Sequence, residues 1–270
     1  MTDSYLAAIV IAIVEGITEF LPVSSTGHMI LAEKFFPLPA RIAATFEIFI
    51  QLGAILAIVF LYPHRFKALV PKKSELSFAA SGFQGIRALS LLAVACLPAF
   101  VLGALLHGYI KAHLFTPFTV AIGLVVGGII LIVVEIFPRA ETITRVDDLT
   151  MRSAFAVGVA QCFSLWPGVS RSGATMVGGL LCGINRYAAA EFSFLLAVPI
   201  MCAAVTLDLL KSASHLSTAD IPLFAVGFIT ALLVAIIAVK AFVALLGRVG
   251  LAPFGYYRIL VGVIVLTLWN

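Results

Sequence analysis

Long apolar segments constrain this chain more than any other feature of its sequence. Ten such segments follow one another, and six are long enough to cross a bilayer, which takes about 20 residues with a range of about 17 to 25. Charged residues make up only 11% of the chain, whereas a soluble domain carries about a quarter. The sequence therefore predicts an all-α integral membrane protein. The six predicted transmembrane helices are 46–62, 88–106, 117–137, 190–210, 222–246 and 254–269, the last being marginal.

Four further apolar segments are too short to span the bilayer, and they fall into two consecutive pairs. The first pair is 5–20 with 27–36, and the second is 152–165 with 173–182. The connection inside each pair is rich in Pro, Ser and Gly rather than in charge. Such a pair can enter the membrane and return on the same side, with its irregular loop buried in protein. We therefore predict two re-entrant helix pairs beside the six spans.

Polar side chains are concentrated in the first pair, in the stretch E-G-I-T-E-F-L-P-V-S-S-T-G-H that ends at His28. Glu15 and Glu19 share one face of a helix, where two like charges repel and lose their hydration. Such a pair is expected if it holds a metal ion, shares a proton or faces a bound cation. Ser25 lies three residues before His28, close enough to cooperate across one helical turn, and the amides that begin the second helix can hold an anion. This density of polar groups favours phosphate chemistry over a polar kink. Further candidates for substrate binding in the loop are Ser24, Thr26 and Gly27.

The second pair contains the loop W-P-G-V-S-R-S-G-A-T, which carries the single arginine Arg171. An arginine in a re-entrant loop is costly unless it faces a partner or water. Its planar fork binds phosphate in a bidentate manner, which makes Arg171 a candidate catalytic residue. A structural pairing with Glu15 or Glu19 is the alternative, and both roles can hold together. Candidate substrate-binding residues in this loop are Ser170, Ser172, Gly173 and Thr175.

The two pairs resemble each other at a constant offset of 146 residues. V-S-S-T-G at 23–27 aligns with V-S-R-S-G at 169–173, and Glu15 aligns with Gln161. The chain therefore reads as one membrane domain, 1–270, made of repeat halves at about 1–137 and 138–270. Each half has three spans, an odd number, so the second half must be inverted relative to the first. Inverted repeats with broken helices place a site near the bilayer midplane, where we expect the two loops to meet.

The distribution of basic residues predicts the orientation. Of the 17 Lys and Arg residues, eleven fall on one side, four on the other and two inside the membrane. The richer side should be cytoplasmic, which places both termini outside and opens the site to the outer, periplasmic side. No basic region precedes the first apolar segment, so we expect no cleaved signal peptide. The net charge of +4 comes without a basic stripe, which argues against nucleic-acid binding.

The motifs around Glu15 to His28 and P-G-V-S-R-S-G-A-T, with F-E-x-x-I-Q-L-G at 46–53, resemble the undecaprenyl pyrophosphate phosphatase family, also called the bacitracin-resistance proteins. The resemblance covers nearly the whole chain. It implies a bacterial inner-membrane hydrolase of the lipid carrier cycle of peptidoglycan synthesis, which removes the terminal phosphate of undecaprenyl diphosphate. It further implies Ser25 as nucleophile, the acidic pair Glu15 and Glu19, His28, Arg171, and a C-terminal arginine at Arg258. A divalent cation, magnesium or calcium, is implied as cofactor and would be held by the acidic pair.

Several assignments stay open at this stage. Either Ser25 attacks phosphorus to give a phosphoserine, or His28 or a carboxylate activates water directly. Gln51 is a further candidate lining residue, and Glu191 is expected to pair with Arg186 or Arg171. A polyprenyl phosphate transporter is the competing function class, because inverted repeats are common among transporters. The expected partners are the polyprenyl diphosphate substrate and membrane lipid, and a homodimer is compatible with such a chain.

Overall fold

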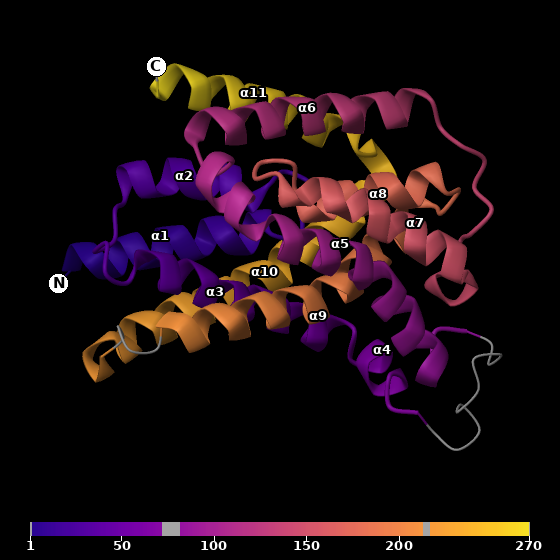
Figure 1. Ribbon diagram of the computed structural model, residues 1–270, viewed down its shortest axis with the longest axis horizontal. Helices are drawn as coiled ribbons and strands as arrows, with labels where there is room; N and C mark the ends of the chain where they lie inside the picture. Colours follow the sequence, from indigo (N-terminus) through magenta and orange to yellow (C-terminus); the bar gives the residue numbers. More distant parts are fainter. Residues whose placement is uncertain (1, 72–81, 213–216, 270) are drawn as a thin grey trace.

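The computed structural model describes residues 2–71, 82–212 and 217–269, and the regular structure in these ranges is helical apart from one isolated backbone bridge. Figure 1 shows a bundle of helices that run along the long axis of the molecule. The first half contains α1 (Thr2–Thr18), α2 (Ser25–Phe35), α3 (Ala43–Leu61), α4 (Pro63–Ala68), α5 (Gly85–His113) and α6 (Pro117–Ile136). The second half contains η2 (Val146–Asp148), α7 (Met151–Gln161), η3 (Cys162–Leu165), α8 (Arg171–Leu181), α9 (Arg186–Ser212), η5 (Thr218–Asp220), α10 (Ile221–Val249) and α11 (Ala252–Leu268).

Five of these helices are long and apolar enough to cross a membrane, namely α3, α5, α6, α9 and α10. This agrees with the prediction of an all-α, multi-pass membrane protein. The sixth predicted span, 254–269, forms α11, whose 17 residues put it with the shorter apolar helices. The four short segments form α1, α2, α7 and α8. Lys72 and Lys73, which contributed to the predicted orientation, lie outside the described residues.

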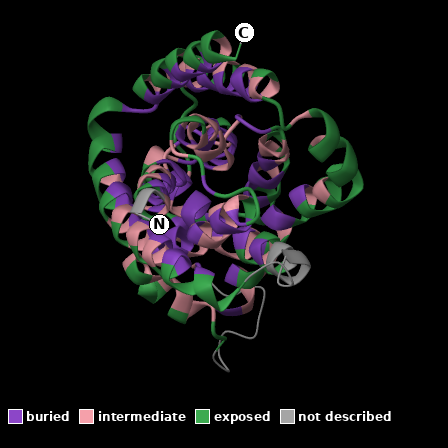
Figure 2. Ribbon diagram, turned by 90° about the vertical axis from the view of Figure 1, so that its left-hand side faces the viewer, coloured by how far each residue is buried: buried purple, intermediate pink, exposed green. Residues whose placement is uncertain are grey.

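Apolar side chains cover the outside of the molecule as well as its interior. Figure 2 shows buried residues facing the inside of the bundle and exposed residues facing outward. Many outward residues are large and apolar, such as Leu105 on α5, which is 75% exposed, and Ile237 on α10. A soluble protein rarely carries so much contiguous apolar surface. This exterior is suited to contact with lipid. The arrangement of the helices is therefore determined by the packing between them.

Helices of the two halves are interleaved rather than segregated. The helix α3 packs against both α9 and α10, α1 packs against α10, α5 packs against α7, and α6 lies along α11 (Figure 1). Small residues permit the close approaches, since a Cβ at Gly53 on α3 would overlap the carbonyl of Phe228 on α10. Small residues at helix interfaces are typical of membrane bundles, where dispersion contacts replace the hydrophobic driving force.

Ion pairs also join the halves. Arg41 with Asp220, Glu135 with Arg186, and Glu19 with Arg171 each connect a residue before position 138 to one after it. A fourth connection runs from Arg65 to Asp147 at 2.9 Å and to Glu191 at 2.7 Å. The expected pairing of Glu191 with Arg186 or Arg171 is therefore wrong. Arg65 lies on α4, just after α3, and its side chain bonds to Glu191 on α9. Arg186 bonds instead to Glu135 on α6.

Arg258 on α11 ties the two predicted re-entrant loops together. Its guanidinium is 1% exposed and donates to the carbonyls of Gly168 at 2.9 Å and Val169 at 2.7 Å in the second loop. It also donates to the carbonyl of Pro22 in the first loop at 3.3 Å and to Gly123 on α6 at 3.1 Å. Irregular backbone inside a membrane needs such donors, because no water is present to satisfy its carbonyls. Arg258 thus supports both loops, and its role as a substrate-binding residue, which the family resemblance implies, stays a prediction.

We expect Gly127→Ala to lower turnover at least about tenfold while the protein stays folded. A Cβ at Gly127 on α6 would overlap Nη2 of Arg258, so we expect the guanidinium to shift and to weaken its bonds to the loop carbonyls. Displacing a catalytic loop by about 1 Å can cost on the order of a hundredfold. Gly108→Ala on α5 is the matched control, because nothing lies within 4 Å of the added carbon. Wild-type turnover in Gly127→Ala would show that Arg258 does not hold the loops in their active arrangement.

Asp147 gives a pH-dependent contribution to stability. Hydrogen bonds from Arg65 lower the pKa of Asp147 from its usual 3.8 to about 2. A lowered pKa in the folded state means stability that is present above pH 3.8 and lost as the pH falls toward 2. We expect Asp147→Asn to cost about 1–2 kcal/mol, or roughly 3–6 °C in Tm, at neutral pH.

The measurement is thermal unfolding in detergent from pH 7 to pH 2, where wild type and Asp147→Asn should converge at the acid end. Asparagine can still accept from the amide of Phe83, as Asp147 does at 3.0 Å, so the change removes the charge and the acceptor for Nη2 of Arg65 while it keeps this contact. The exposed Asp148→Asn is the control. A difference that persists at pH 2 would contradict the assignment to the carboxylate charge.

Candidate active site

Two serines in strained backbone conformations open the helices α2 and α8. Ser24 has φ 72° and Ser170 has φ 75°, and they are the non-glycine residues with positive φ in the described ranges. They lie 146 residues apart, at equivalent places in the two sequence motifs. Residues in this region cost on the order of 1–3 kcal/mol and cluster at functional sites. At each of these serines the backbone turns sharply, so that α2 begins at Ser25 and α8 at Arg171.

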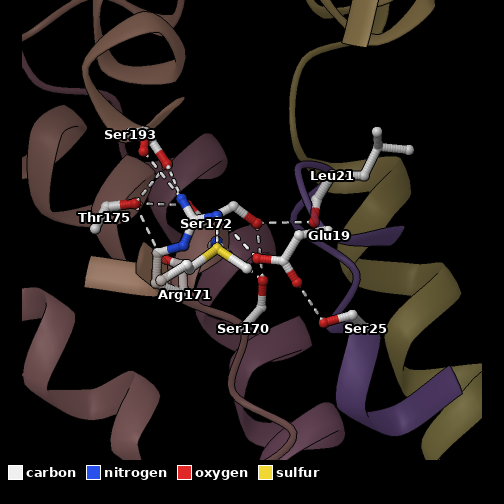
Figure 3. Close-up of polar contacts among 10 residues, drawn as sticks. Glu19, Leu21, Ser25, Ser170, Arg171, Ser172, Thr175 and Ser193 are labelled. Carbon is white, nitrogen blue, oxygen red and sulfur yellow. Dashed lines mark hydrogen bonds and ion pairs between the residues drawn. The ribbon is translucent and has the colours of Figure 1, made fainter. Parts of the chain in front are cut away.

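The carboxylate of Glu19 joins the two loops. Figure 3 shows Ser25, Glu19 and Arg171 in one line of contacts. The hydroxyl of Ser25 donates to Oε2 of Glu19 at 2.7 Å, and Nη2 of Arg171 donates to Oε1 of Glu19 at 3.0 Å. A hydroxyl on a carboxylate is the arrangement of a nucleophile with its general base. Glu19 is 9% exposed and Ser25 is half-buried, so the base is shielded while the hydroxyl is accessible.

Arg171 is also held by hydrogen bonds to α9. Its Nη1 donates to the carbonyl of Ser193 at 2.9 Å, and the Ser193 hydroxyl also accepts from Oγ1 of Thr175 at 2.7 Å (Figure 3). Ser193 is fully buried, and it was missed at the sequence level. A single serine in the apolar run F-S-F-L-L was its only signal, because its sequence separation from Arg171 carries no information about contact.

The hydroxyls of the second loop are mostly engaged in hydrogen bonds within the protein. Ser172 is fully buried and donates to the carbonyl of Leu21 in the first loop at 2.8 Å. The Ser170 hydroxyl accepts from the amide of Gly173 at 3.1 Å and caps α8. Thr175 is 1% exposed and bonds to Ser193 and to its own helix. Of these three hydroxyls, only that of Ser170 belongs to a partly exposed residue, whereas Ser172 joins the two loops and Thr175 joins α8 to α9.

Glu15 lies one turn before Glu19 on α1 and is 1% exposed. Its Oε1 has no hydrogen-bond partner among the described residues, and its charge interacts with those of Glu19 and Arg171. A buried carboxylate oxygen without a hydrogen-bond partner is a suitable ligand for magnesium or calcium. The described residues contain no cluster of three or more His, Cys, Asp and Glu side chains, so such a cation would need oxygen ligands from the substrate or water.

Both ring nitrogens of His28 contact partners other than Ser25. Its Nδ1 lies 2.8 Å from the carbonyl of Ser24, and its Nε2 lies 2.8 Å from the hydroxyl of Tyr257 on α11. The contact that the spacing of Ser25 and His28 suggested is therefore made by Glu19 instead. Tyr257 was not among the sequence candidates, since nothing in its neighbourhood links it to position 28.

The other sequence candidates differ in burial and surroundings. Thr26 is half-buried in the first turn of α2, and Gly27 is buried where a Cβ would overlap Leu124 on α6. Gly173 faces Arg258, whose Nη1 would lie 3.0 Å from an added Cβ. Gln51 is half-buried on α3. The structure thus brings together Ser25, Glu19 and Arg171 directly, with the remaining candidates as supports or neighbours.

Comparison with known proteins identifies the family of this chain. Residues 8–264 match the family described as bacitracin resistance protein BacA. The chain is 51% identical over 259 residues to the undecaprenyl-diphosphatase of Desulfovibrio desulfuricans, covering 96% of each chain. It is 49% identical over 271 residues to the undecaprenyl-diphosphatase of Maridesulfovibrio salexigens, covering 100% of each chain. This chain belongs to the BacA family of bacitracin-resistance proteins.

Proposed function

We propose that this protein is an undecaprenyl-diphosphate phosphatase, which hydrolyses the terminal phosphate to give undecaprenyl phosphate and inorganic phosphate. Two relatives at about half identity carry the name undecaprenyl-diphosphatase. The observation that carries the proposal is the contact of Ser25 with Glu19 at 2.7 Å, backed by Arg171 at 3.0 Å on the other carboxylate oxygen. Transport requires groups that bind phosphate, but it does not require a hydroxyl placed on a buried base.

The chemistry divides between the two loops. Glu19 accepts the proton of the Ser25 hydroxyl as Oγ bonds to the terminal phosphorus, and the bridging P–O bond breaks to release undecaprenyl phosphate. Arg171 sits beside Glu19, where its fork can neutralise charge on the transferred phosphoryl oxygens. Water then attacks the phosphoserine and its proton passes to a base. The bond between Oγ of Ser25 and phosphorus breaks to give inorganic phosphate, and Oγ takes its proton back from Glu19. Direct attack by water activated by Glu19 or His28 gives the same products from the same residues.

A divalent cation fits the charge balance of the site. Glu15 and Glu19 carry two negative charges when ionised, and Arg171 and Arg258 carry two positive ones, so the protein groups are balanced before a diphosphate enters. In a low-dielectric setting several further negative charges are strongly disfavoured. Glu15, with its free Oε1, and Glu19 would hold magnesium or calcium. When bound, such a cation neutralises charge on the phosphate oxygens.

The proposed setting is the bacterial inner membrane, with the site accessible from the periplasmic side. We propose an inverted repeat of two re-entrant pairs and six spans, including α11. The support is the equivalent strain at Ser24 and Ser170, together with matching helix lengths. The helices α2 and α8 each have 11 residues, and α5 and α10 each have 29. Both termini lie toward one end of the molecule and α4 lies toward the other (Figure 1), as the charge bias requires.

The test of the function is phosphate release from undecaprenyl diphosphate by the purified protein. We expect wild type to release phosphate and Ser25→Ala to lose at least about a hundredfold in kcat, because the nucleophile is gone while Glu19 and Arg171 remain. Ser90→Ala is the matched control, since that hydroxyl only bonds to the carbonyl of Ile86 within α5. Absence of phosphate release by folded wild type would refute the function, and full activity of Ser25→Ala would instead favour direct attack by water.

The two carboxylates should respond differently to divalent cations. We expect Glu15→Gln to raise the cation concentration needed for half-maximal activity by about tenfold or more, because an amide oxygen is a weaker ligand than a carboxylate. Glu19→Gln should mainly lower kcat, since Ser25 then loses its base. Phosphate release is measured while magnesium or calcium is titrated. Glu33→Gln on α2 is the control. If both variants keep the wild-type cation requirement at a near-wild-type rate, the pair does not hold the cation.

A further inference from the structure

The ring of His28 is held at both nitrogens, and the chemistry of its partners fixes where its protons lie. The carbonyl of Ser24 can only accept, so Nδ1, at 2.8 Å, must carry a proton. In a neutral imidazole Nε2 is then the acceptor, and the hydroxyl of Tyr257, also at 2.8 Å, must donate to it. When the ring is charged, Nε2–H donates and the Tyr257 oxygen accepts. The hydroxyl therefore serves both protonation states of His28, and neither state leaves a ring nitrogen unpaired.

The contact between these residues is built by the tertiary structure. Position 28 on α2 and position 257 on α11 are 229 residues apart. Their rings are stacked, with centroids 5.5 Å apart and planes at 15°. The next residue, Arg258, is anchored to the carbonyls of both loops, so this turn of α11 has little freedom. Tyr257 itself is 45% exposed, whereas Arg258 is 1% exposed, so Tyr257 lies at the surface of α11 and Arg258 in its packed side.

We propose that Tyr257 is a positioning residue of the phosphatase reaction, which holds His28 in one tautomer and gives it a partner in both protonation states. This inference rests on the proposed function. Glu19 already serves Ser25, so His28 is left for the later proton transfer, in which a base takes the proton of the attacking water. An imidazole in apolar surroundings changes its charge readily only if each state keeps its hydrogen bonds. Tyr257 acts through His28 and has no effect of its own on the reacting atoms.

The experiment is a double-mutant cycle on phosphate release from undecaprenyl diphosphate by the full-length protein. Tyr257→Phe keeps the stacked ring and removes only the hydroxyl. We expect it to lower kcat about three- to tenfold with KM within about twofold, the size of one lost hydrogen bond. In a His28→Gln background the same change should alter kcat by less than about twofold, because the partner is already gone. Tyr256→Phe, on the neighbouring residue that is 62% exposed, is the matched control.

A second measurement does not depend on activity. In protein labelled with nitrogen-15 at histidine, the His28 signals are assigned by their loss in His28→Gln. We expect the Nδ1–H tautomer in wild type, and a shift of the Nε2 resonance in Tyr257→Phe but not in Tyr256→Phe. An unchanged Nε2 resonance, the opposite tautomer, or an equal loss of kcat by Tyr257→Phe with and without His28 would each overturn the proposal.

Failure of this inference can be told apart from failure of the proposed function. If wild type releases phosphate and Tyr257→Phe matches it in kcat, only the role of Tyr257 is wrong. If folded wild type releases no phosphate, the function is wrong, whatever the His28 resonances show.

Discussion

The buried ion pair of Glu19 with Arg171 is the interaction on which the site depends. Each charge alone would be costly in apolar surroundings, and removing one partner of a buried pair typically costs about 3–5 kcal/mol. The pair is formed between the two halves of the chain, so the cost of separating them resists any motion that parts the loops. It also orients the carboxylate, because one oxygen is taken by Arg171 and the other is left for Ser25.

The loops that carry this pair are irregular, and buried irregular backbone must find donors and acceptors within the protein. Arg258 provides donors for both loops, and Ser172 provides one more to the carbonyl of Leu21. Neither is placed to react. They explain how two strained turns, at Ser24 and Ser170, persist: the surrounding contacts over-determine the backbone. Catalytic geometry here is a property of the supports as much as of the reacting groups.

Polar groups in this protein are consequently paired across helices, while its exterior stays apolar. The pairs Arg41–Asp220 and Arg65–Asp147 fasten one half to the other away from the loops, and Glu19–Arg171 does so within them. In lipid, burial of apolar side chains gives helices little reason to associate, so close packing at residues such as Gly53 and these polar contacts decide the arrangement. The same logic makes an unpartnered atom informative, as with Oε1 of Glu15.

The sequence by itself determined the membrane class, the short helix pairs, the polar loops and the presence of Glu19, Ser25 and Arg171 among the reacting candidates. These follow from hydropathy and local spacing, which report lipid exposure and neighbours on one helix. Only the tertiary structure decided that Glu19 rather than His28 contacts Ser25, that Ser193 holds Arg171, and that Glu191 pairs with Arg65. The reason is physical: when nearly every helix face is apolar, periodicity cannot tell which faces meet. A contact such as that of His28 with Tyr257, 229 residues away, therefore exists only in the folded chain.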